Sequence, residues 1–300
     1  MKNMVAPEKN ISIAPYTYYK IGGIAREVYF PDNEEELYKV LSGLHNDKTP
    51  YYILGGGSNV LVGDGYWDGA VIMTARMDGW EAEPDYLVCG AGLPSSQAAD
   101  IALEHSRTGL EFLYLLPGSI GGALAGNARY DYRSISDVLV SLKAVHPERG
   151  IRKFSAEEIH FSYKHTDITS EGWIIGSLAL GWREDDTGEI RRRMEEIRNS
   201  RTAGRHFEYP SCGCVFKNDY TRNVQAGRLI DSLGLKGMTV GGARVADFHA
   251  NFIINTGKAT ALDVLTLIEK IECIVRERTG IVLVREVRVV GRMGKEKDKE

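Results

Sequence analysis

Glycine is concentrated in five short segments of this chain, and these segments limit the folds that it can adopt. The chain has 33 glycines among 300 residues, whereas a globular protein has a usual share of about 7%. The excess gathers in residues 20–25, 53–65, 89–94, 116–127 and 235–245. Because glycine permits tight turns and close approach of backbone segments, this pattern predicts many short strands joined by tight loops.

Hydrophobic periodicity predicts the helices and strands themselves. The helical pattern is clearest over residues 33–47, 94–109, 188–205 and 261–280. The first helix has Asp32 or Asn33 as its N-cap, and the last has one apolar face and ends at Gly280. Strands are predicted where β-branched and aromatic residues gather, in residues 27–31, 51–57, 69–75, 86–92, 137–147 and 173–182. Since strands and helices do not alternate as a repeated βαβ unit, the sequence predicts an α+β fold.

Composition indicates a soluble globular protein and disfavours two classes of partner. Hydrophobic residues make up 43% of the chain and charged residues 26%, with a formal net charge of -4, so no general attraction to nucleic acid is expected. The N-terminal residues contain no apolar signal region, and no apolar run approaches the roughly 20 residues needed to cross a bilayer. With four cysteines at no framework spacing, we expect a cytoplasmic protein with reduced thiols and no membrane insertion.

Two of the glycine clusters have the character of phosphate-binding loops. The segment "LGGGSN" follows a predicted strand and can turn several backbone N–H groups to one side, at Gly55, Gly56, Gly57, Ser58 and Asn59. The segment "LPGSIGGALAGN" has the same character, with glycines and a serine at Gly118, Ser119, Gly121 and Gly122. Neither matches the dinucleotide or P-loop fingerprints. Each could be a tight turn only, but two clusters in one strand-rich region favour a pyrophosphate ligand.

The segment "PSCGCVFKN" raises a separate question, because two cysteines flank a glycine. A zinc or iron–sulfur site built on Cys212 and Cys214 would need two further ligands, and Cys89 and Cys273 lie in a predicted strand and a predicted helix. We therefore expect no metal site. A Cys212–Cys214 disulfide would close a strained loop. From the residues alone, a small buried thiol under a turn and a catalytic thiol both stay open.

Seven segments, taken together and in order, resemble those of bacterial UDP-N-acetylenolpyruvoylglucosamine reductases. They are "TYYKIGGIAREVYFP", "ILGGGSNVLVGDGYWDGAVI", "LPGSIGGALAGNA", "PSCGCVFKN", "AGRLIDSLGLKG", "VGGARVADFHANFIIN" and "EVRVVG". The resemblance covers about residues 17–292 and is to the shorter of the family's two types. It implies a two-lobed FAD-binding domain of the vanillyl-alcohol-oxidase/PCMH type, followed by a smaller α+β substrate-binding domain.

The polar, turn-rich segment at 183–190 marks the boundary between these domains. The predicted FAD-binding domain is 17–183, with lobes of about 17–74 and 75–183. The substrate-binding domain is 188–292, and a charged tail occupies 293–300.

The resemblance also implies the chemistry. NADPH reduces a non-covalently bound FAD, and the reduced flavin N5 delivers hydride to the enolpyruvyl ether of UDP-N-acetylglucosamine. A protein acid protonates the neighbouring carbon to give UDP-N-acetylmuramate, a peptidoglycan precursor. The partners would be this UDP-sugar and NADPH. The glycine loops above would then bind FAD together with Asn127, and the oligomeric state is not implied.

Three residues receive catalytic roles by position. Cys214 stands where the family's Pro-Ser-Ala-Gly-Ser motif has its proton-donating serine, and Cys212 stands at a small packing residue. A thiol has a pKa of about 8.5, so it is largely protonated at neutral pH and is a stronger acid than an alcohol. Glu286 matches the family's C-terminal glutamate. Lys164 stands at an arginine that helps to polarise the substrate carboxylate, and it keeps the charge but loses the bidentate fork.

Further residues are assigned to the substrate. Strand alternation in "IVLVREVRVVG" puts Val284, Glu286 and Arg288 on one face, so Arg288 is directed toward a substrate carboxylate. A cross-strand ion pair on a solvated face is the alternative from spacing alone. The remaining candidates follow the family's motifs, and they are Tyr163, Lys217, Asn218, Arg228, His249 and Asn251.

Four departures from the family's pattern lie at or near the expected site: Cys214, Lys164, the segment "NARYDY" at 127–132, and Arg205-His206 in place of Gln-Pro. They keep open a divergent flavin reductase of the same fold that acts on another substrate. A catalytically silent FAD- or UDP-sugar-binding homologue also stays open. A flavoprotein oxidase or dehydrogenase of the same FAD-domain class is disfavoured by the reductase-specific half from "PSCGC" to "EVRVVG".

Overall fold

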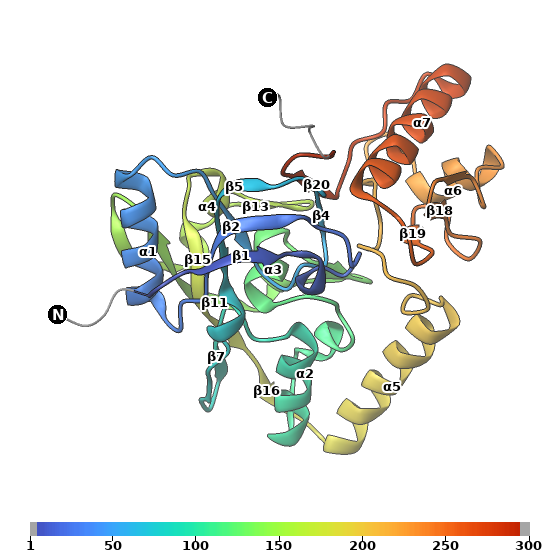
Figure 1. Cartoon of the computed structure of the whole chain (residues 1–300). Coiled ribbons are helices and arrows are strands. Elements are labelled where there is room, and N and C mark those ends of the chain that lie inside the picture. Colours follow the sequence, from blue (N-terminus) through green and yellow to red (C-terminus); the bar gives the residue numbers. More distant parts are fainter. Residues whose placement is uncertain (1–4, 295–300) are drawn as a thin grey trace. The chain divides into compact units, whose positions relative to one another are not determined.

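The computed structural model describes residues 5–294 (Figure 1). Of the predicted charged tail at 293–300, only Met293 and Gly294 are described, and residues 295–300 lie outside the described residues. The helices are α1 (Glu34–Asn46), α2 (Ser95–Glu104), α3 (Ile120–Ala125), α4 (Asp167–Ser170), α5 (Thr187–Ala203), α6 (Ala226–Ser232) and α7 (Ala261–Thr279). Short 3-10 helices are η1 (Ala14–Tyr16), η2 (Thr74–Arg76), η3 (Glu111–Leu113), η4 (Ile135–Asp137) and η5 (Ala156–Glu158).

Short strands account for most of the remaining regular structure. The first half has β1 (Glu8–Ser12), β2 (Ile24–Tyr29), β3 (Tyr51–Leu54), β4 (Val60–Val62), β5 (Trp67–Met73), β6 (Trp80–Ala82), β7 (Tyr86–Gly90), β8 (Arg107–Thr108), β9 (Arg129–Tyr130), β10 (Arg133–Ser134) and β11 (Leu139–His146). The second half has β12 (Gly150–Ser155), β13 (Phe161–Ser162), β14 (His165–Thr166), β15 (Ile174–Gly181), β16 (Arg183–Glu184), β17 (Thr239–Val240), β18 (Ala243–Val245), β19 (Ile253–Asn255) and β20 (Arg288–Val290). The predicted α+β class is confirmed, and each of the four predicted helices is present. The prediction of 94–109 was too long, because α2 ends at Glu104 and Arg107–Thr108 form β8.

The chain forms two compact units that interleave along the sequence. Unit 1 comprises residues 5–9, 27–56 and 69–201, and unit 2 comprises residues 10–26, 57–68 and 202–294. Each unit has its own hydrophobic core. Helix α5 belongs to unit 1 almost to its end, because the division falls after Arg201.

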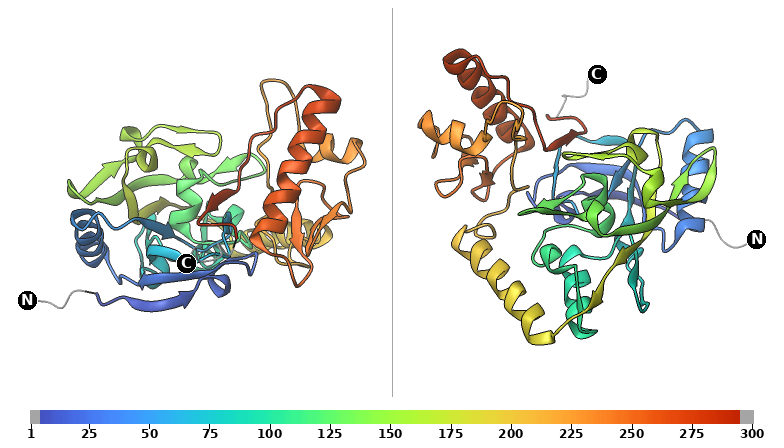
Figure 2. Two further views of the ribbon diagram at one scale, coloured as in Figure 1. Left: turned by 45° about the horizontal axis from the view of Figure 1, so that its top comes forward. Right: turned by 180° about the vertical axis from the view of Figure 1, so that it is seen from behind.

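Unit 1 is organised around an antiparallel sheet with strand order β12-β11-β15-β7-β6. A second sheet has the order β1-β2-β5-β3, in which β3 and β5 run parallel. Helix α1 lies against β11, β12 and β15 (Figure 2), and its apolar side chains share a core with Ile72 of β5 and Val145 of β11. Its N-cap is Asn33, whose side chain accepts the Glu36 N–H. The main core lies between the sheet β12-β11-β15-β7-β6 and helices α2 and α3.

Unit 2 is built on α7 and short strands. Helix α7 packs against β17, β18 and α6 (Figure 1). It begins at the Thr260 capping box and ends at Gly280 in the left-handed conformation, as its sequence predicts. The unit's core joins α7 to Tyr19 and Leu61, which come from the two N-terminal segments. No helix within residues 5–294 has both the length and the apolar character needed to cross a membrane.

Candidate active site

The two glycine clusters meet in unit 1. A Cβ atom on Gly56 would lie 2.4 Å from the Cα of Gly118 and 2.6 Å from the N of Ser119, so only glycine fits there. The Gly56 N–H donates to the Ser119 Oγ at 3.1 Å, and the same oxygen caps α3 by accepting the Gly122 N–H. The structure thus brings together two loops that are more than 60 residues apart in the chain.

The glycines of the second cluster have different surroundings. Gly121 and Gly122 lie in the first turn of α3 rather than in a loop, because Ser119 begins the helix. A Cβ on Gly121 would lie 2.6 Å from the Ala91 Cβ, so this glycine permits α3 to pack on the chain after β7. A Cβ on Gly122 would meet only Ser119 Oγ, at 3.5 Å, which leaves room beside it.

The backbone amides of these loops fit an anionic group such as the FAD diphosphate. In the part of the chain that the structure describes, the N–H groups of Gly118 and Ser119 have no protein acceptor. In unit 2, the same holds for the N–H groups of Gly57, which is buried, and Ser58, which is half-buried. Buried or half-buried amides normally find a partner, so these donors suit a bound oxyanion.

Asn127 connects the altered loop of unit 1 to the hairpin that carries Lys164. It is buried, its amide nitrogen donates to the Ser162 carbonyl at 3.2 Å, and its amide oxygen accepts the Ser136 N–H at 3.4 Å. Strands β13 and β14 pair Ser162 with His165, so Tyr163 and Lys164 form the tip of a two-residue hairpin. The Asn127 side chain therefore fixes the segment next to Tyr163 and Lys164.

The loop at 127–132 forms a small hairpin of its own. Strand β9 pairs with β10, Asp131 has a φ of 54°, and Tyr132 at the tip is exposed. The Arg129 side chain donates to the Asp131 carbonyl at 2.9 Å. In this departure from the family's pattern, Arg129 thus stabilises the turn and Tyr132 faces solvent.

In unit 2, the segment that carries Cys214 lies between two other segments. Cys214 forms an antiparallel bridge with Phe252, and the Val215 N–H donates to the Asn251 carbonyl at 2.9 Å. On the other side, the Glu286 N–H donates to the Val215 carbonyl at 2.7 Å. The structure therefore sets Cys214 and Glu286 on adjoining segments.

Asn251 is held in the core beneath this segment. It is 3% exposed, its amide oxygen accepts the Phe216 N–H at 2.9 Å, and its amide nitrogen donates to the Phe216 carbonyl at 2.8 Å. Both ends of the side chain are used on one backbone residue. The geometry gives Asn251 a positioning role for the Cys214 segment.

The Glu286 segment is fixed from its other side by the glycine-rich loop. The Asn59 amide nitrogen donates to the Glu286 carbonyl at 3.2 Å, and the Asn59 carbonyl accepts the Arg288 N–H at 3.2 Å. The predicted long strand is regular only at β20, whose Arg288 pairs with Val60 of β4. Burial nevertheless alternates along this segment, so Val284, Glu286 and Arg288 lie on the more exposed side. The irregularity arises because single hydrogen bonds to residues 215 and 217 replace a continuous ladder.

Cys212 differs from Cys214 in its surroundings. Cys212 is 7% exposed and belongs to the unit 2 core, which confirms its predicted packing role. Burial raises the pKa of its thiol to about 12, and the charges of Glu286 and Cys214 add to this rise. The fully buried Tyr19 belongs to the same core and lowers the pKa of this thiol.

The other substrate candidates surround α6. Asn218 accepts the Ala226 N–H with its amide oxygen and so caps α6, and Arg228 on that helix is exposed. His249 accepts the Asn251 N–H with Nδ1, and burial lowers its pKa, so the ring is neutral near pH 7. A Cβ on Gly227 would lie 3.3 Å from the His249 ring. The Lys217 N–H donates to the Val284 carbonyl, which aligns Lys217 with the Glu286 segment.

Sequence reasoning missed three residues that position the site: Tyr19, Phe252 and the side chain of Asn59 as a link to Glu286. Tyr19 and Phe252 lie inside the quoted motifs, but nothing in a motif shows which distant segment a residue contacts. All four cysteines are free thiols. Among residues 5–294, no group of three or more His, Cys, Asp or Glu side chains is placed to hold a metal ion.

Comparisons with known proteins agree with this arrangement. A family model for an FAD binding domain matches residues 25–155, and one for the C-terminal domain of UDP-N-acetylenolpyruvoylglucosamine reductase matches residues 205–290. These matches confirm the predicted FAD-binding domain followed by a smaller α+β domain.

Relatives of the same name match nearly the whole chain. The reductase from Caldanaerobacter subterraneus subsp. tengcongensis is 35% identical over 92% of this chain and 91% of its own. The reductase from Clostridium novyi is 36% identical over 95% of this chain and 92% of its own. The crystal structure of the reductase from Thermus caldophilus has a TM-score of 0.82 at 31% identity, and the match covers 96% of this chain and all of that one. Similarity of this extent shows that the chain belongs to the UDP-N-acetylenolpyruvoylglucosamine reductase family.

Proposed function

We propose that this chain is an FAD-dependent reductase that uses NADPH to convert the enolpyruvyl ether of UDP-N-acetylglucosamine to UDP-N-acetylmuramate, a peptidoglycan precursor. One observation carries the proposal: the Glu286 N–H donates to the Val215 carbonyl, so Cys214 and Glu286 lie on adjoining segments. The similarity to reductases over nearly the whole chain supports the same reaction. UDP-sugars and NADPH are cytoplasmic metabolites, so the proposal places the protein in the cytoplasm.

FAD is assigned to residues 17–183 and the UDP-sugar to residues 188–292. The free amides of the two glycine loops would take the FAD diphosphate, with Gly55 and Gly56 permitting the loops to approach. Asn127 would support the FAD site indirectly, because its amide nitrogen donates a hydrogen bond to the Ser162 carbonyl and fixes that segment. These residues would hold FAD, and the bound cofactor would provide the hydride-transfer chemistry between NADPH and the substrate.

Cys214 donates the proton in this proposal. A protonated thiol can give up a proton at neutral pH far more readily than an alcohol can, which permits cysteine at the family's serine position. We assign Glu286 to the reacting carbon; its backbone is held by Asn59 from one side and by Val215 from the other. Asn251 keeps the Cys214 segment in register through Phe216.

Cationic residues would bind the anionic parts of the substrate. Lys164 and Tyr163, at a hairpin tip, and Arg288, on the face of Glu286, are assigned to the enolpyruvyl carboxylate. Lys217, Asn218, Arg228 and His249 are assigned to the UDP-sugar. A neutral His249 with Nδ1 already accepting a hydrogen bond offers its Nε2–H as a donor.

The test follows the flavin spectrum without air. Purified protein should be yellow, NADPH should bleach it, and the enolpyruvyl UDP-sugar should restore the colour. Bleaching without recovery would contradict this substrate and favour a divergent reductase, the second candidate that the rebuilt 127–132 hairpin supports. A protein that cannot be loaded with FAD would contradict the flavin chemistry and favour a silent homologue.

A further inference from the structure

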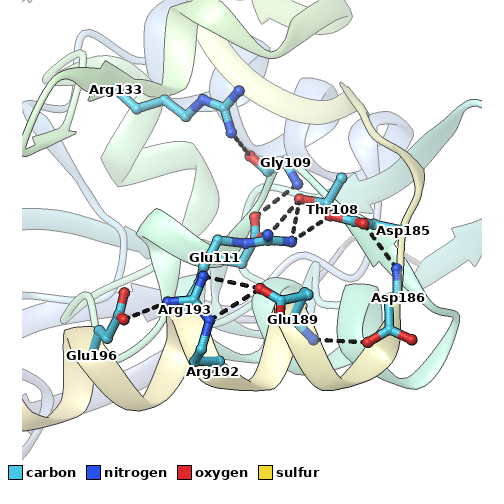
Figure 3. Close-up of polar contacts among 10 residues, drawn as sticks. All are labelled: Thr108, Gly109, Glu111, Arg133, Asp185, Asp186, Glu189, Arg192, Arg193 and Glu196. Carbon is cyan, nitrogen blue, oxygen red and sulfur yellow. Dashed lines mark hydrogen bonds and ion pairs between the residues drawn. The ribbon is translucent and has the colours of Figure 1, made fainter.

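Three arginines of helix α5 contact other residues of unit 1. Two of them, Arg193 and Arg198, donate hydrogen bonds to protein acceptors. Arg193 donates to Glu111 at 2.9 Å, to Asp185 at 2.6 Å and to the Thr108 hydroxyl at 3.2 Å (Figure 3). Burial works against its charge, but Asp185 and Glu111 outweigh burial and raise the pKa of Arg193. The charge and hydrogen-bond donors of Arg193 are therefore satisfied by protein groups.

Arg198, one turn further along α5, is also satisfied. Its guanidinium donates to the Tyr114 hydroxyl and lies 5.6 Å from the ring centroid of the same tyrosine. It also pairs with Glu195 at 3.6 Å, and its side chain is about half exposed. Water and protein together satisfy this group.

Arg201 differs from both. It is only 6% exposed, and its Nε is buried without a hydrogen-bond partner in the described chain. Within residues 5–294 it forms no ion pair, and its guanidinium lies over the Tyr130 ring, whose centroid is 4.6 Å from the Arg201 Cζ. Burial lowers the pKa of its guanidinium, and Tyr130 offsets this only in part.

Such a group is costly unless something anionic joins it. A buried charge without a hydrogen-bonding counterion is among the least favourable features in a protein interior. A ring face supplies some attraction but accepts no hydrogen bond in the guanidinium plane. A planar guanidinium with open donors matches the oxygens of a phosphate or carboxylate.

Tyr130 ties Arg201 to the part of unit 1 that already carries the proposed ligand contacts. It lies in β9, three residues after Asn127, whose amide holds Ser162 beside Tyr163 and Lys164. We infer that Arg201, backed by the Tyr130 ring, binds an oxyanion of a bound ligand. This inference rests on the proposed function, which supplies three ligands with a suitable oxyanion. The oxyanion would belong to the FAD diphosphate, an NADPH phosphate or the carboxylate of the enolpyruvyl group.

Methionine at position 201 separates this role from a structural one. R201M keeps the length of the side chain but removes the buried charge, so the ligand-free protein should unfold at the same temperature as wild type or a higher one. R201K keeps the charge but loses the bidentate guanidinium, so its ligand affinity should lie between those of wild type and R201M. R198M is the matched control, since Arg198 has its own protein acceptor on the same helix.

Three binding measurements identify the source of the oxyanion. They are the FAD dissociation constant from flavin fluorescence, the NADPH dependence of anaerobic flavin reduction, and the spectral titration of oxidised holoenzyme with the enolpyruvyl UDP-sugar. We expect R201M to weaken one of them about 10- to 100-fold, the range for a charge-assisted hydrogen-bonded pair. R198M should weaken none.

The inference is overturned if R201M binds all three ligands as wild type does, or if it lowers the unfolding temperature of the ligand-free protein with no loss of binding. Either result leaves the reductase function standing. Conversely, a wild-type chain that takes up no flavin would contradict the proposed function alone. In that case inorganic pyrophosphate is the probe: it should raise the unfolding temperature of wild type and not of R201M, and an equal shift in both would overturn the inference.

Discussion

Cys212 and Cys214 are separated by one glycine, yet they occupy different environments. Gly213 has a φ of 76°, a conformation that glycine adopts without strain, and it turns the chain between the two thiols. Cys212 enters the core beside Tyr19, whereas Cys214 stays partly exposed beside Phe252. Their chemical reactivity should differ accordingly.

We predict that alkylation at pH 8 modifies Cys214 and stops reduction of the enolpyruvyl substrate, while NADPH still bleaches the flavin. Cys89 and Cys212 are protected, because burial raises the pKa of each thiol to about 12. C214A should lower the rate of the second half-reaction by about 10²- to 10⁴-fold, as expected for loss of a general acid. C214S should retain more of that rate than C214A.

Cys273 is the control in this experiment. It is partly exposed on α7, and its hydrogen bond to Glu277 raises the pKa of its thiol. The C273S variant should respond to alkylation as wild type does. Full turnover after mass spectrometry has shown complete modification of Cys214 would rule out the proton-donor role.

A second prediction concerns Asn251. N251A leaves the N–H and the carbonyl of Phe216 buried without partners, so it should lower the free energy of unfolding by about 2–4 kcal/mol. Because Phe216 follows Cys214 by two residues, the same change should slow substrate reduction more than flavin reduction. Urea denaturation and the two half-reactions measure these effects.

N199A serves as the comparison, since Asn199 is exposed on α5 and its loss should change stability by less than about 0.5 kcal/mol. Equal stability of N251A and N199A would show that the Phe216 contacts contribute nothing.

At the scale of elements, local sequence signals predicted most of what the structure contains. Asn33 and Gly280 mark helix ends because capping depends on residues within one turn. The sequence predicted a strand through 281–287, but the structure has a regular strand only at β20. A strand's regularity depends on its partners, and the partner of 281–287 is a single short segment at 215–217. The helix at Ile120–Ala125 was hidden by its glycines, which disfavour helices yet permit α3 to pack closely on Ala91.

The buried carboxylate of Glu111 should make the anchoring of α5 depend on pH. Burial tends to raise its pKa, but hydrogen bonds from Thr108, Gly109 and Arg193 outweigh burial and lower it (Figure 3). A carboxyl whose folded pKa is depressed adds stability above its unfolded pKa of about 4.3, and this stability is lost as the pH falls through the folded value.

We therefore predict that E111Q lowers the free energy of unfolding by about 1–3 kcal/mol at pH 7 and by progressively less below about pH 4.3. Thermal unfolding at several pH values measures the difference. E196Q is the matched control, because Glu196 forms an exposed pair with Arg192 on the same helix and should cost under about 1 kcal/mol. A wild-type-to-E111Q difference that does not change with pH would contradict this account.

At the scale of the whole molecule, the interleaving of the two units was not accessible from sequence. Motifs nominated Cys214 and Glu286 because their chemistry is recognisable locally. The segments that support them could not be nominated, because Asn59 lies 227 residues from Glu286 and Asn255 lies 236 residues from Tyr19. Contacts over such separations depend on how the whole chain folds, which no local pattern encodes.

The last prediction follows from this interleaving. The C-terminal fragment 202–300 lacks Tyr19 and Leu61, which are fully buried in the unit 2 core, and also β4, the partner of β20. It also loses Asp64, which accepts the Ala261 N–H at the start of α7. We expect this fragment to show helical far-ultraviolet circular dichroism but no cooperative thermal transition.

Restoring the two N-terminal segments should restore folding. A chain in which residues 10–26 and 57–68 are joined to 202–300 by flexible linkers supplies Tyr19, Leu61, Asp64 and β4 again, and it should unfold cooperatively. The matched control carries Tyr19→Ala in this linked chain, which should lose about 3–5 kcal/mol, as for other large-to-small core substitutions of aromatic residues. A cooperative transition in fragment 202–300 alone, at the same temperature as in the linked chain, would show that the N-terminal segments are dispensable for unit 2.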